Sequence, residues 1–325
     1  MQFFLTNAVL DMARERISRI APGSTFTTTD EQGRSSGADV SGTEVVFLSS
    51  DLLQWSRSSD GVRAAILGAL SAPALAWVQS ASTGVEHPVF GALLERGVRV
   101  TNAPGLHAPP IAEYVFAHLL ALSKRVREHA ALQASRDYTP LESDELRDKT
   151  LGILGFGGIG RATARIARAF GMRVVAVRRT PGPDLDADEM LPPGRLDEML
   201  RAIHVVLVAV PLTPETRRLL DGERLSRMRP DAVLVNVARG AIVDETALIE
   251  ALRRGRLRAA ILDAHEDEPL PRDSPLWELE QCVVTAHDSA RSPRTLERGV
   301  SFFLENLSRF VANAPLQGDI SQPGA

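Results

Sequence analysis

The sequence of 325 residues contains a single cysteine, Cys282, and therefore cannot form an intrachain disulfide. It also lacks an uninterrupted apolar run of about 18 residues, the length that a membrane-spanning helix needs. Its most apolar stretch, AAILGALSAPALAWV, is interrupted by Ser71 and Pro73. The N-terminal segment becomes acidic at Asp11, before the apolar core of a secretory leader could form. These absences predict a soluble cytoplasmic protein with no membrane partner.

An excess of basic residues is also missing. The chain has 37 Lys and Arg against 41 Asp and Glu, a formal net charge of −4, which argues against a nucleic-acid partner. Hydrophobic residues make up 44% and charged residues 24% of the chain, as in globular proteins with a packed core. The length exceeds that of one ordinary core and predicts two domains.

The sequence does contain short apolar runs that alternate with helical patterns. This rhythm is typical of an α/β fold, in which helices cover both faces of a parallel sheet. Strands are expected at QFFL, VVFL, LAWVQ, LGIL, MRVVAV, HVVLVAV, AVLVNV, AAILDA and CVVTAH. A long helix is expected over 111–128, and the polar segment 24–43 is expected to hold only a short strand. We predict a smaller flavodoxin-like domain over 1–102, completed by 290–325, and a doubly wound Rossmann cofactor domain over 103–289.

A glycine pattern, GFGGIG, directly follows the predicted strand LGIL and precedes a predicted helix. In this context Gly155 permits a tight turn, Gly157 lets the backbone approach a pyrophosphate, and Gly160 allows close packing of helix and strand. The unpaired N–H groups at the start of the helix would face the phosphates. The strand–turn–helix context predicts a dinucleotide-binding site.

The residue type at the end of the next predicted strand bears on which dinucleotide binds. An acidic residue is expected there in an NAD site, because it binds the ribose hydroxyls. This sequence has Arg178 and Arg179, followed by Thr180. Guanidinium groups suit a 2′-phosphate, and Thr180 could add a hydroxyl donor. We therefore predict that NADP(H) is preferred, with NAD(H) possible.

Polar side chains follow three later predicted strands. Arg239 comes after AVLVNV, Asp263 and Glu268 come after AAIL, and His287 comes after CVV. Ligands of open α/β sheets bind at the carboxyl ends of the strands. Arg239 could bind a carboxylate and polarise a ketone, and His287 could donate a proton to the ketone oxygen. Glu268 beside His287 would favour the protonated imidazole, and Asp263 could accept a hydrogen bond from the nicotinamide carboxamide.

Other reactive residue types have simpler interpretations. His265, Glu266, Asp267 and Glu268 are adjacent in one loop, and such residues rarely converge on one ion, so no metal site is predicted. Cys282 precedes the apolar residues VVT and is expected to be a buried structural thiol rather than a nucleophile.

Several separated segments resemble one family. The segments SASTGVEH, VTNAPGLHAPPIAEYVFAHLLAL, GFGGIG, VPLTPETRRLL, NVARGAIVDETALIEAL, LDAHEDEPLPRDSPLWELEQCVVTAH and ENLSRF occur in the family's order. Together they resemble the D-isomer-specific 2-hydroxyacid dehydrogenases, particularly the glyoxylate/hydroxypyruvate reductase-like members. The resemblance extends from about Leu75 to Phe310. Departures at Glu86, Gly158 and His265 and in TAH leave the shape of the substrate pocket open.

The resemblance implies roles by position. It assigns Arg239, Glu268 and His287 to catalysis, and the backbone of Thr83 and Gly84, with Arg239, to the substrate carboxylate. It implies a homodimer, to which the segment 130–141 would contribute. The implied cofactor contacts share a position after the strands of the cofactor domain and are Gly155, Gly157, Gly158, Ile159, Gly160, Arg178, Arg179, Thr180, Val210, Pro211, Thr216, Val237, Ala238 and Asp263.

The expected activity is hydride transfer between NADPH and a small 2-oxo acid related to glyoxylate or hydroxypyruvate. The cofactor and substrate are expected to meet in a cleft between the two domains, whose closure would exclude water. Phosphite and formate dehydrogenases share the scaffold and stay open as an alternative. A dinucleotide-sensing corepressor-like protein without turnover is the alternative from another class. The sequence does not identify the substrate or the physiological direction.

Overall fold

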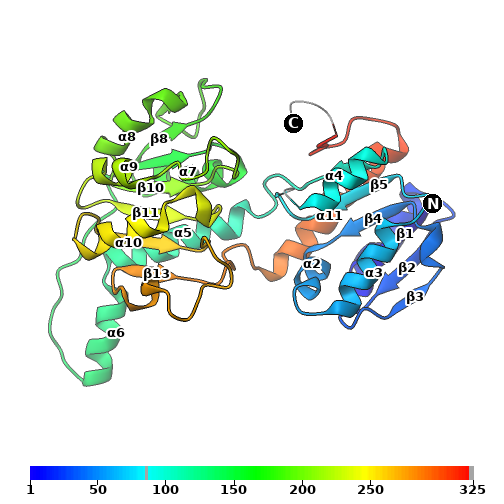
Figure 1. The fold of residues 1–325 in the computed structure, drawn as a ribbon, viewed down its shortest axis with the longest axis horizontal. Helices are drawn as coiled ribbons and strands as arrows, with labels where there is room; N and C mark the ends of the chain where they lie inside the picture. The colour runs from blue at the N-terminus through cyan, green and yellow to red at the C-terminus, as the bar shows by residue number, and fades with distance from the viewer. Residues whose placement is uncertain (85–86, 322–325) are drawn as a thin grey trace. The chain divides into compact units, whose positions relative to one another are not determined.

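The computed structural model describes residues 1–84 and 87–321. It divides into two compact units, which are Met1–Leu106 with Ser292–Ala325, and His107–Arg291. The predicted domain bounds, 1–102 with 290–325 and 103–289, stay a prediction. Among the described helices, none combines the length and the hydrophobicity that crossing a bilayer requires. Each unit is described separately below (Figure 1).

In its described residues, the first unit holds a six-stranded sheet in the order β3-β2-β1-β4-β5-β6. All neighbouring strands are parallel except β2 and β3. The order β2-β1-β4-β5-β6 is the flavodoxin-like one, with β3 as an added antiparallel edge. The strands are β1 (Gln2–Thr6), β2 (Thr25–Thr29), β3 (Ser35–Gly37), β4 (Val45–Leu48), β5 (Trp77–Ser80) and β6 (Arg99–Thr101).

The helices of the first unit pack on both faces of this sheet. They are α1 (Asn7–Ile20), α2 (Ser50–Ser56), α3 (Asp60–Leu70), α4 (Pro88–Glu95) and α11 (Pro293–Val311). Phe303 of α11 stacks on Phe47 and Trp77 of the sheet, with ring centroids 4.7 and 5.4 Å apart. The C-terminal helix therefore completes the core of the unit that the N-terminal residues begin.

The segment 24–43 contains more strand than the sequence indicated. We expected only a short strand, whereas β2 and β3 form an antiparallel pair there. The β-branched run TFTTT of β2 pairs with β1, so its strand preference is supported by a buried neighbour. The signal was weak because every residue of β3 is exposed.

The second unit holds a parallel seven-stranded sheet in its described residues, in the order β13-β12-β11-β10-β7-β8-β9. The strand order reverses between β7 and β10, which is where doubly wound sheets bind ligands. This arrangement confirms the predicted Rossmann-type fold. Its strands are β7 (Thr150–Leu154), β8 (Arg173–Val177), β9 (Glu189–Leu191), β10 (Val205–Val208), β11 (Val233–Asn236), β12 (Ala259–Leu262) and β13 (Cys282–Val284).

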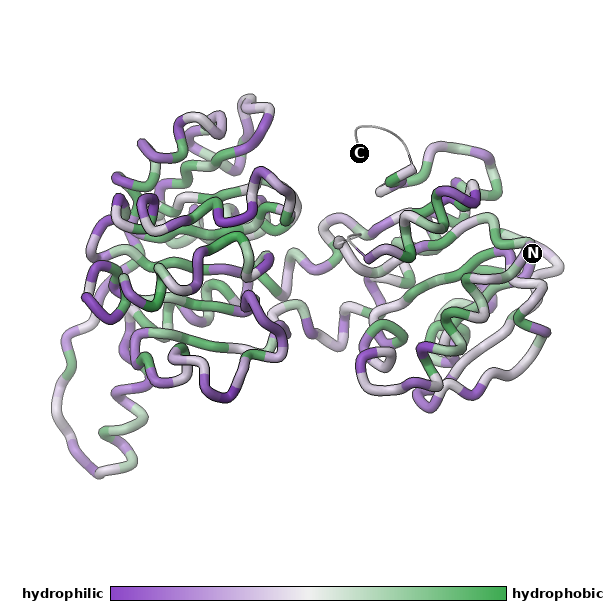
Figure 2. Tube along the Cα trace, viewed as in Figure 1, coloured by the Kyte–Doolittle hydropathy of each residue, from purple (hydrophilic) through white to green (hydrophobic). Residues whose placement is uncertain are grey.

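Two apolar clusters cover the faces of this sheet. One contains buried residues of α5 and α7, and the other contains buried residues of α8, α9 and α10. Figure 2 shows hydrophobic residues concentrated along the strands. The helices are α5 (Ala108–Ser123), α6 (Val126–Ser135), α7 (Gly158–Ala169), α8 (Leu196–Ala202), α9 (Gly222–Arg227) and α10 (Glu245–Arg253).

The helix predicted over 111–128 is wrong in its bounds. The chain forms α5 and α6 instead, and Arg125 between them is left-handed, with φ of 53°. The buried face of the helix ends with Ser123, and no residue of α6 is buried. In Figure 1, α6 and the segment that follows extend away from the sheet of their unit.

Candidate active site

Three neighbouring parallel strands bring the predicted catalytic residues to one edge of the sheet. Arg239 follows β11, Glu268 follows β12 and His287 follows β13, and these strands pair in that order. Parallel strands all end at the same edge, so residues far apart in the sequence meet there. The predicted grouping on the carboxyl side of the sheet is therefore present in the described structure.

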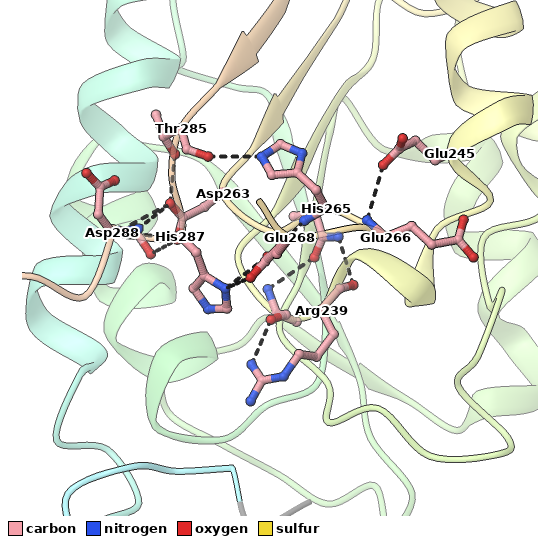
Figure 3. Close-up of polar contacts among 12 residues, drawn as sticks. Arg239, Glu245, Asp263, His265, Glu266, Glu268, Thr285, His287 and Asp288 are labelled. Atoms are coloured by element: carbon pink, nitrogen blue, oxygen red, sulfur yellow. Dashed lines mark hydrogen bonds and ion pairs between the residues drawn. The ribbon is translucent and has the colours of Figure 1, made fainter. Parts of the chain in front are cut away.

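His287 and Glu268 form a direct pair. The imidazole Nδ1 of His287 lies 2.8 and 3.0 Å from the two carboxylate oxygens of Glu268. Figure 3 shows the two side chains pointing toward one another. Both are partly exposed, at 29% and 38%, so the pair can be reached by a small molecule. With Nδ1 engaged, Nε2 is the nitrogen that can exchange a proton with a substrate.

The electrostatics of Glu268 favour its ionised form. Burial by itself would raise the pKa of Glu268, but hydrogen bonds from His287 and from the backbone N–H of His265 outweigh that effect. The pKa therefore lies below its ordinary value of 4.5. A carboxylate that stays ionised at neutral pH stabilises a protonated imidazole beside it.

Local hydrogen bonds shape the loop that carries Arg239. The Asn236 side chain accepts from the N–H of Ala238 at 3.1 Å and donates to the carbonyl of Arg239 at 3.0 Å. The next residue, Gly240, lies so close to the His265 backbone that an added Cβ would be 1.9 Å from the His265 carbonyl carbon. Only glycine fits there, and its close approach brings the Arg239 loop against the loop of Glu268.

Asp263 is buried, with 1% of its surface exposed. One carboxylate oxygen accepts from the Thr285 hydroxyl at 2.7 Å and from the N–H of Asp288 at 2.9 Å. Both oxygens accept from the N–H of Ser289, and its hydroxyl bonds one of them. Each carboxylate oxygen thus accepts hydrogen bonds from the loop that carries His287. The described structure thus uses Asp263 to fix the loop of His287, and its predicted contact with nicotinamide stays a prediction.

The glycine turn has the shape that a dinucleotide requires. Gly155 has a φ of 92°, and a Cβ there would lie 2.5 Å from the Ala209 carbonyl oxygen. A Cβ at Gly160 would lie 2.5 Å from the Gly155 oxygen, whereas Gly157 faces open space. The turn leads into α7, whose first N–H groups lack partners within the helix. An open glycine before a helix N-terminus fits a pyrophosphate.

The family model that matches this chain describes the D-isomer specific 2-hydroxyacid dehydrogenase, NAD binding domain, and covers residues 116–289. The chain is also 35% identical over 249 residues to a glyoxylate reductase of Aeropyrum pernix, covering 74% of each chain. The chain belongs to the D-isomer specific 2-hydroxyacid dehydrogenases. It is accordingly an NAD(P)-dependent oxidoreductase of the 2-hydroxyacid dehydrogenase type.

Two further proteins are similar to this dehydrogenase. It is 37% identical over 258 residues to a D-3-phosphoglycerate dehydrogenase of Mycobacterium leprae, covering 79% of this chain and 48% of that protein. The chain thus spans about half the length of that relative. A D-isomer specific 2-hydroxyacid dehydrogenase from Xanthobacter autotrophicus, solved with NADPH and MES, has 26% identity and a TM-score of 0.76. That match covers 98% of this chain and 97% of the other.

The other predicted cofactor residues of the dehydrogenase lie on loops that follow its strands or in the first turn of α7. Val210, Pro211 and Thr216 follow β10, and the Thr216 hydroxyl donates to the Pro211 carbonyl at 2.7 Å. Val237 and Ala238 follow β11, while Gly158 and Ile159 begin α7. All of them belong to the second unit.

Arg178, Arg179 and Thr180 follow β8, as predicted from the sequence. Arg178 is partly exposed, and Arg179 and Thr180 are exposed. Arg161 of α7 pairs with Asp184 and lies over the Phe156 ring, 5.1 Å from its centroid. Burial acts to raise the pKa of Asp184, but hydrogen bonds from Asp186 and Arg161 and the charges of Arg161 and Arg178 lower it. Asp184 is therefore an acidic neighbour of this basic cluster.

Thr83 and Gly84 follow β5 in the first unit. The N–H of Gly84 donates to the Ser82 hydroxyl at 3.2 Å, and the Thr83 carbonyl accepts from the Asn102 side chain at 2.9 Å. These bonds shape a loop in which Thr83 is exposed and Gly84 is partly exposed. Its predicted role in binding the substrate carboxylate stays a prediction. Glu86, noted as a departure from the family, lies outside the described residues.

Sequence reasoning missed the residues that support the loop of His287. Tyr114 of α5 bonds the Thr285 hydroxyl at 2.8 Å, and that hydroxyl bonds Asp263. Burial raises the pKa of Tyr114 far above its ordinary value, so its hydroxyl stays neutral. No signal in the sequence links a helix tyrosine to a residue 171 positions away. His265, noted from the sequence as a departure from the family and as part of an acidic loop without a metal site, bonds the Thr285 carbonyl at 2.9 Å.

Proposed function

We propose that this dehydrogenase reduces a small 2-oxo acid, of the glyoxylate or hydroxypyruvate kind, to the D-2-hydroxy acid, with NADPH preferred. The observation that carries the proposal is the pair of His287 and Glu268 at the carboxyl edge of the sheet. An imidazole held in this way can give a proton to a developing alkoxide. The glyoxylate reductase relative supports the substrate class, and the NADPH complex of the Xanthobacter protein supports the cofactor.

In the proposed reaction the reduced nicotinamide supplies the hydride to carbon 2 of the oxo acid. His287 Nε2 gives its proton to the ketone oxygen and becomes neutral. Glu268 holds the ring by Nδ1 and stabilises the protonated form before the transfer. In the oxidation direction the neutral ring takes the proton back.

The proposal assigns substrate binding to Arg239, whose guanidinium pairs with the carboxylate and polarises the ketone. It also assigns backbone N–H groups of Thr83 and Gly84, in the first unit, to the same carboxylate. For the cofactor it assigns the turn of Gly155, Gly157 and Gly160, with Gly158 and Ile159, to the pyrophosphate. The remaining contacts along the cofactor are assigned to Val210, Pro211, Thr216, Val237, Ala238 and Asp263.

The first prediction concerns His287. A screen of 2-oxo acids that follows NADPH absorbance should find turnover, and His287→Ala should lower kcat by about 10²- to 10⁴-fold with cofactor affinity kept. The screen includes phosphite and formate with NADP⁺, because an enzyme that oxidises either of these hydride donors would form NADPH in that assay. Cofactor binding without turnover in every assay, or full turnover in His287→Ala, would contradict the proposal.

The second prediction concerns cofactor preference. A charge-assisted hydrogen bond contributes about 1.5–3 kcal/mol, so the arginines after β8 can change the preference by ten-fold or more. The double variant Arg178→Asp, Arg179→Ser should therefore reverse the ratio of kcat/KM for NADPH over NADH. Arg165→Ser, which removes an exposed arginine of α7 paired with Asp186, serves as the control and should leave the ratio unchanged. An unchanged ratio in the double variant would refute the assignment.

A homodimer is proposed through the arm formed by α6 and the segment up to 141. No residue of α6 is buried, Val126 is 52% exposed and Tyr138 is fully exposed. Exposed apolar and aromatic side chains on a projecting element are typical of an interface. The arm is anchored at its base, where Asp144 pairs with Lys149 and with Arg258.

A further inference from the structure

His265 contacts Glu268 directly and also contacts the loop that leads to His287. Its backbone N–H donates to a Glu268 carboxylate oxygen at 3.1 Å. Its ring Nε2 lies 2.9 Å from the carbonyl oxygen of Thr285, two residues before His287. The side chain is buried, with 6% of the residue exposed. Figure 3 shows the ring of His265 directed at Thr285 and away from the site that His287 faces.

The hydrogen-bond partner shows which nitrogen of this ring donates. A carbonyl oxygen only accepts, so Nε2 carries a proton and donates it to this bond. Within the described residues, the ring Nδ1 is buried and has no hydrogen-bond partner. Burying an unpaired polar atom is unfavourable, and an apolar ring would avoid it. Packing alone therefore does not explain a histidine here, whereas the bond to Thr285 does.

The loop that His265 contacts is one that needs support. His287 has a φ of 52°, in the left-handed region that non-glycine residues rarely adopt. After His287, Asp263 holds the N–H groups of Asp288 and Ser289. Before His287, the hydroxyl of Thr285 is held by Asp263 and its carbonyl by His265. Two bonds thus attach the backbone of Thr285 on the N-terminal side of the strained residue: its N–H donates to the Leu262 carbonyl at 3.0 Å, and its carbonyl is bonded by His265.

We propose that His265 is a positioning residue for the proposed reaction. Its ring bonds the backbone that leads to His287, and its backbone N–H bonds the carboxylate of Glu268. One residue therefore helps to set the separation between His287 and Glu268. His265 does not touch substrate or cofactor in this proposal. The inference rests on the proposed function, because it assumes that the pair of His287 and Glu268 transfers the proton.

Two substitutions separate the hydrogen bond from the shape of the ring. His265→Phe keeps a flat ring but removes the donor. His265→Gln places an amide nitrogen at a similar reach and can donate to the same carbonyl. His204→Phe is the matched control, because His204 also bonds backbone, accepting from the N–H of Thr150 at 3.1 Å, at the opposite ends of the strands.

We expect His265→Phe to lower kcat by about ten-fold or more, since small misplacements of catalytic groups are costly. The KM for the oxo acid and the Kd for NADPH should stay within about two-fold, because binding is assigned to other residues. His265→Gln should recover most of the lost kcat. His204→Phe should keep the wild-type kcat even if it melts earlier.

The result can also be measured without turnover. The signal to follow in ¹⁵N-edited NMR spectra is the Nδ1 proton of His287, which the bond to Glu268 should protect from exchange with water. We expect this signal in the wild type and in His265→Gln. It should be lost or broadened in His265→Phe. This readout keeps the inference testable if no 2-oxo acid is reduced, a result that would refute the proposed function alone. Wild-type kcat and an intact His287 signal in His265→Phe would overturn the inference. So would a His265→Gln variant as impaired as His265→Phe.

Discussion

At the scale of single residues, Glu268 is the group whose ionisation the structure describes most fully. Hydrogen bonds from His287 and from the N–H of His265 hold its pKa below 4.5 despite burial. A carboxylate with a lowered pKa stabilises the folded state at any pH above its ordinary pKa. This stabilisation is lost as the pH falls through the lowered pKa. Glu268 therefore stays ionised across the neutral range, and any loss of activity between pH 5 and pH 8 has another origin.

The third prediction follows from this charge. In Glu268→Gln a neutral amide faces the imidazole, so the protonated ring loses its stabilising partner. We expect kcat for reduction to fall by about 10- to 100-fold, which corresponds to one charge-assisted hydrogen bond. The fall should be seen throughout the neutral pH range, because Glu268 is ionised there in the wild type.

The measurement is the pH profile of kcat at saturating oxo acid. Glu266→Gln is the control, because Glu266 lies two residues away and its side chain approaches Arg218 at 3.9 Å rather than His287. A profile for Glu268→Gln that matches the wild type in height and position would exclude the assigned role.

Cys282 shows how far a residue can be understood from sequence alone. We expected a buried structural thiol, and the residue is 6% exposed in β13. Burial, with a contribution from Glu245, raises the pKa of this thiol to about 12. The apolar residues after it were sufficient for that expectation. Asp263 is different, because its hydrogen bonds go to residues more than 20 positions away.

At the scale of elements, the basic cluster after β8 contains an acidic residue that opposes it. Asp184 pairs with Arg161, and the Arg178 charge acts on it. A 2′-phosphate bound by Arg178 would meet this negative charge. The sequence alone did not show this, because Asp184 lies in an irregular loop, and its side chain is only 10% exposed through contacts with α7.

The fourth prediction is that Asp184→Asn strengthens the preference for NADPH. One unit charge at about 4 Å in a water-like medium is worth roughly 1 kcal/mol, so the Kd for NADPH should fall by about five-fold while that for NADH changes little. Fluorescence titration with both cofactors measures this. Asp186→Asn is the control, since Asp186 pairs with Arg165. A weaker preference in Asp184→Asn would show that Asp184 serves mainly to orient Arg161.

The elements also show what periodicity can and cannot predict. The buried strands of the second sheet are short apolar runs, and the sequence indicated β7, β8, β10, β11, β12 and β13 correctly. The break at Arg125 was not visible, because the apolar stripe continues past the point where its packing partner ends. The strands β6 (RVT) and β9 (EML) lack the uninterrupted apolar run that marks the equally short β13 (CVV). Long-range contacts, rather than local preference, determine these features.

At the scale of the whole molecule, the arm of α6 has no residue of its helix buried against its own unit. Its base is held by Asp144, whose pKa is lowered by hydrogen bonds from Lys149 and Arg258 against the effect of burial. These ion pairs are present when the pH is above 3.8, the ordinary pKa of an aspartate, and they are lost only as the pH falls well below that value. The arm should therefore keep its anchor at every pH used for assays.

The fifth prediction tests the proposed homodimer. The double variant Val126→Glu, Tyr138→Glu places charge on exposed residues of the arm and should give a monomer at micromolar concentration, because unpaired charge opposes burial. Light scattering after size exclusion measures the mass. Leu185→Glu is the control, since Leu185 is 96% exposed outside the arm. A monomeric wild type, or a variant that stays dimeric, would refute the proposal.

The close approach of Gly240 to the backbone of His265 has a consequence for engineering. A library intended to widen substrate range can vary the outer loops, but position 240 admits no other amino acid without separating the two loops. Such a change would lower catalytic activity toward every substrate. Diversity introduced at that position would fill a collection with inactive members, whatever substrate is used for selection.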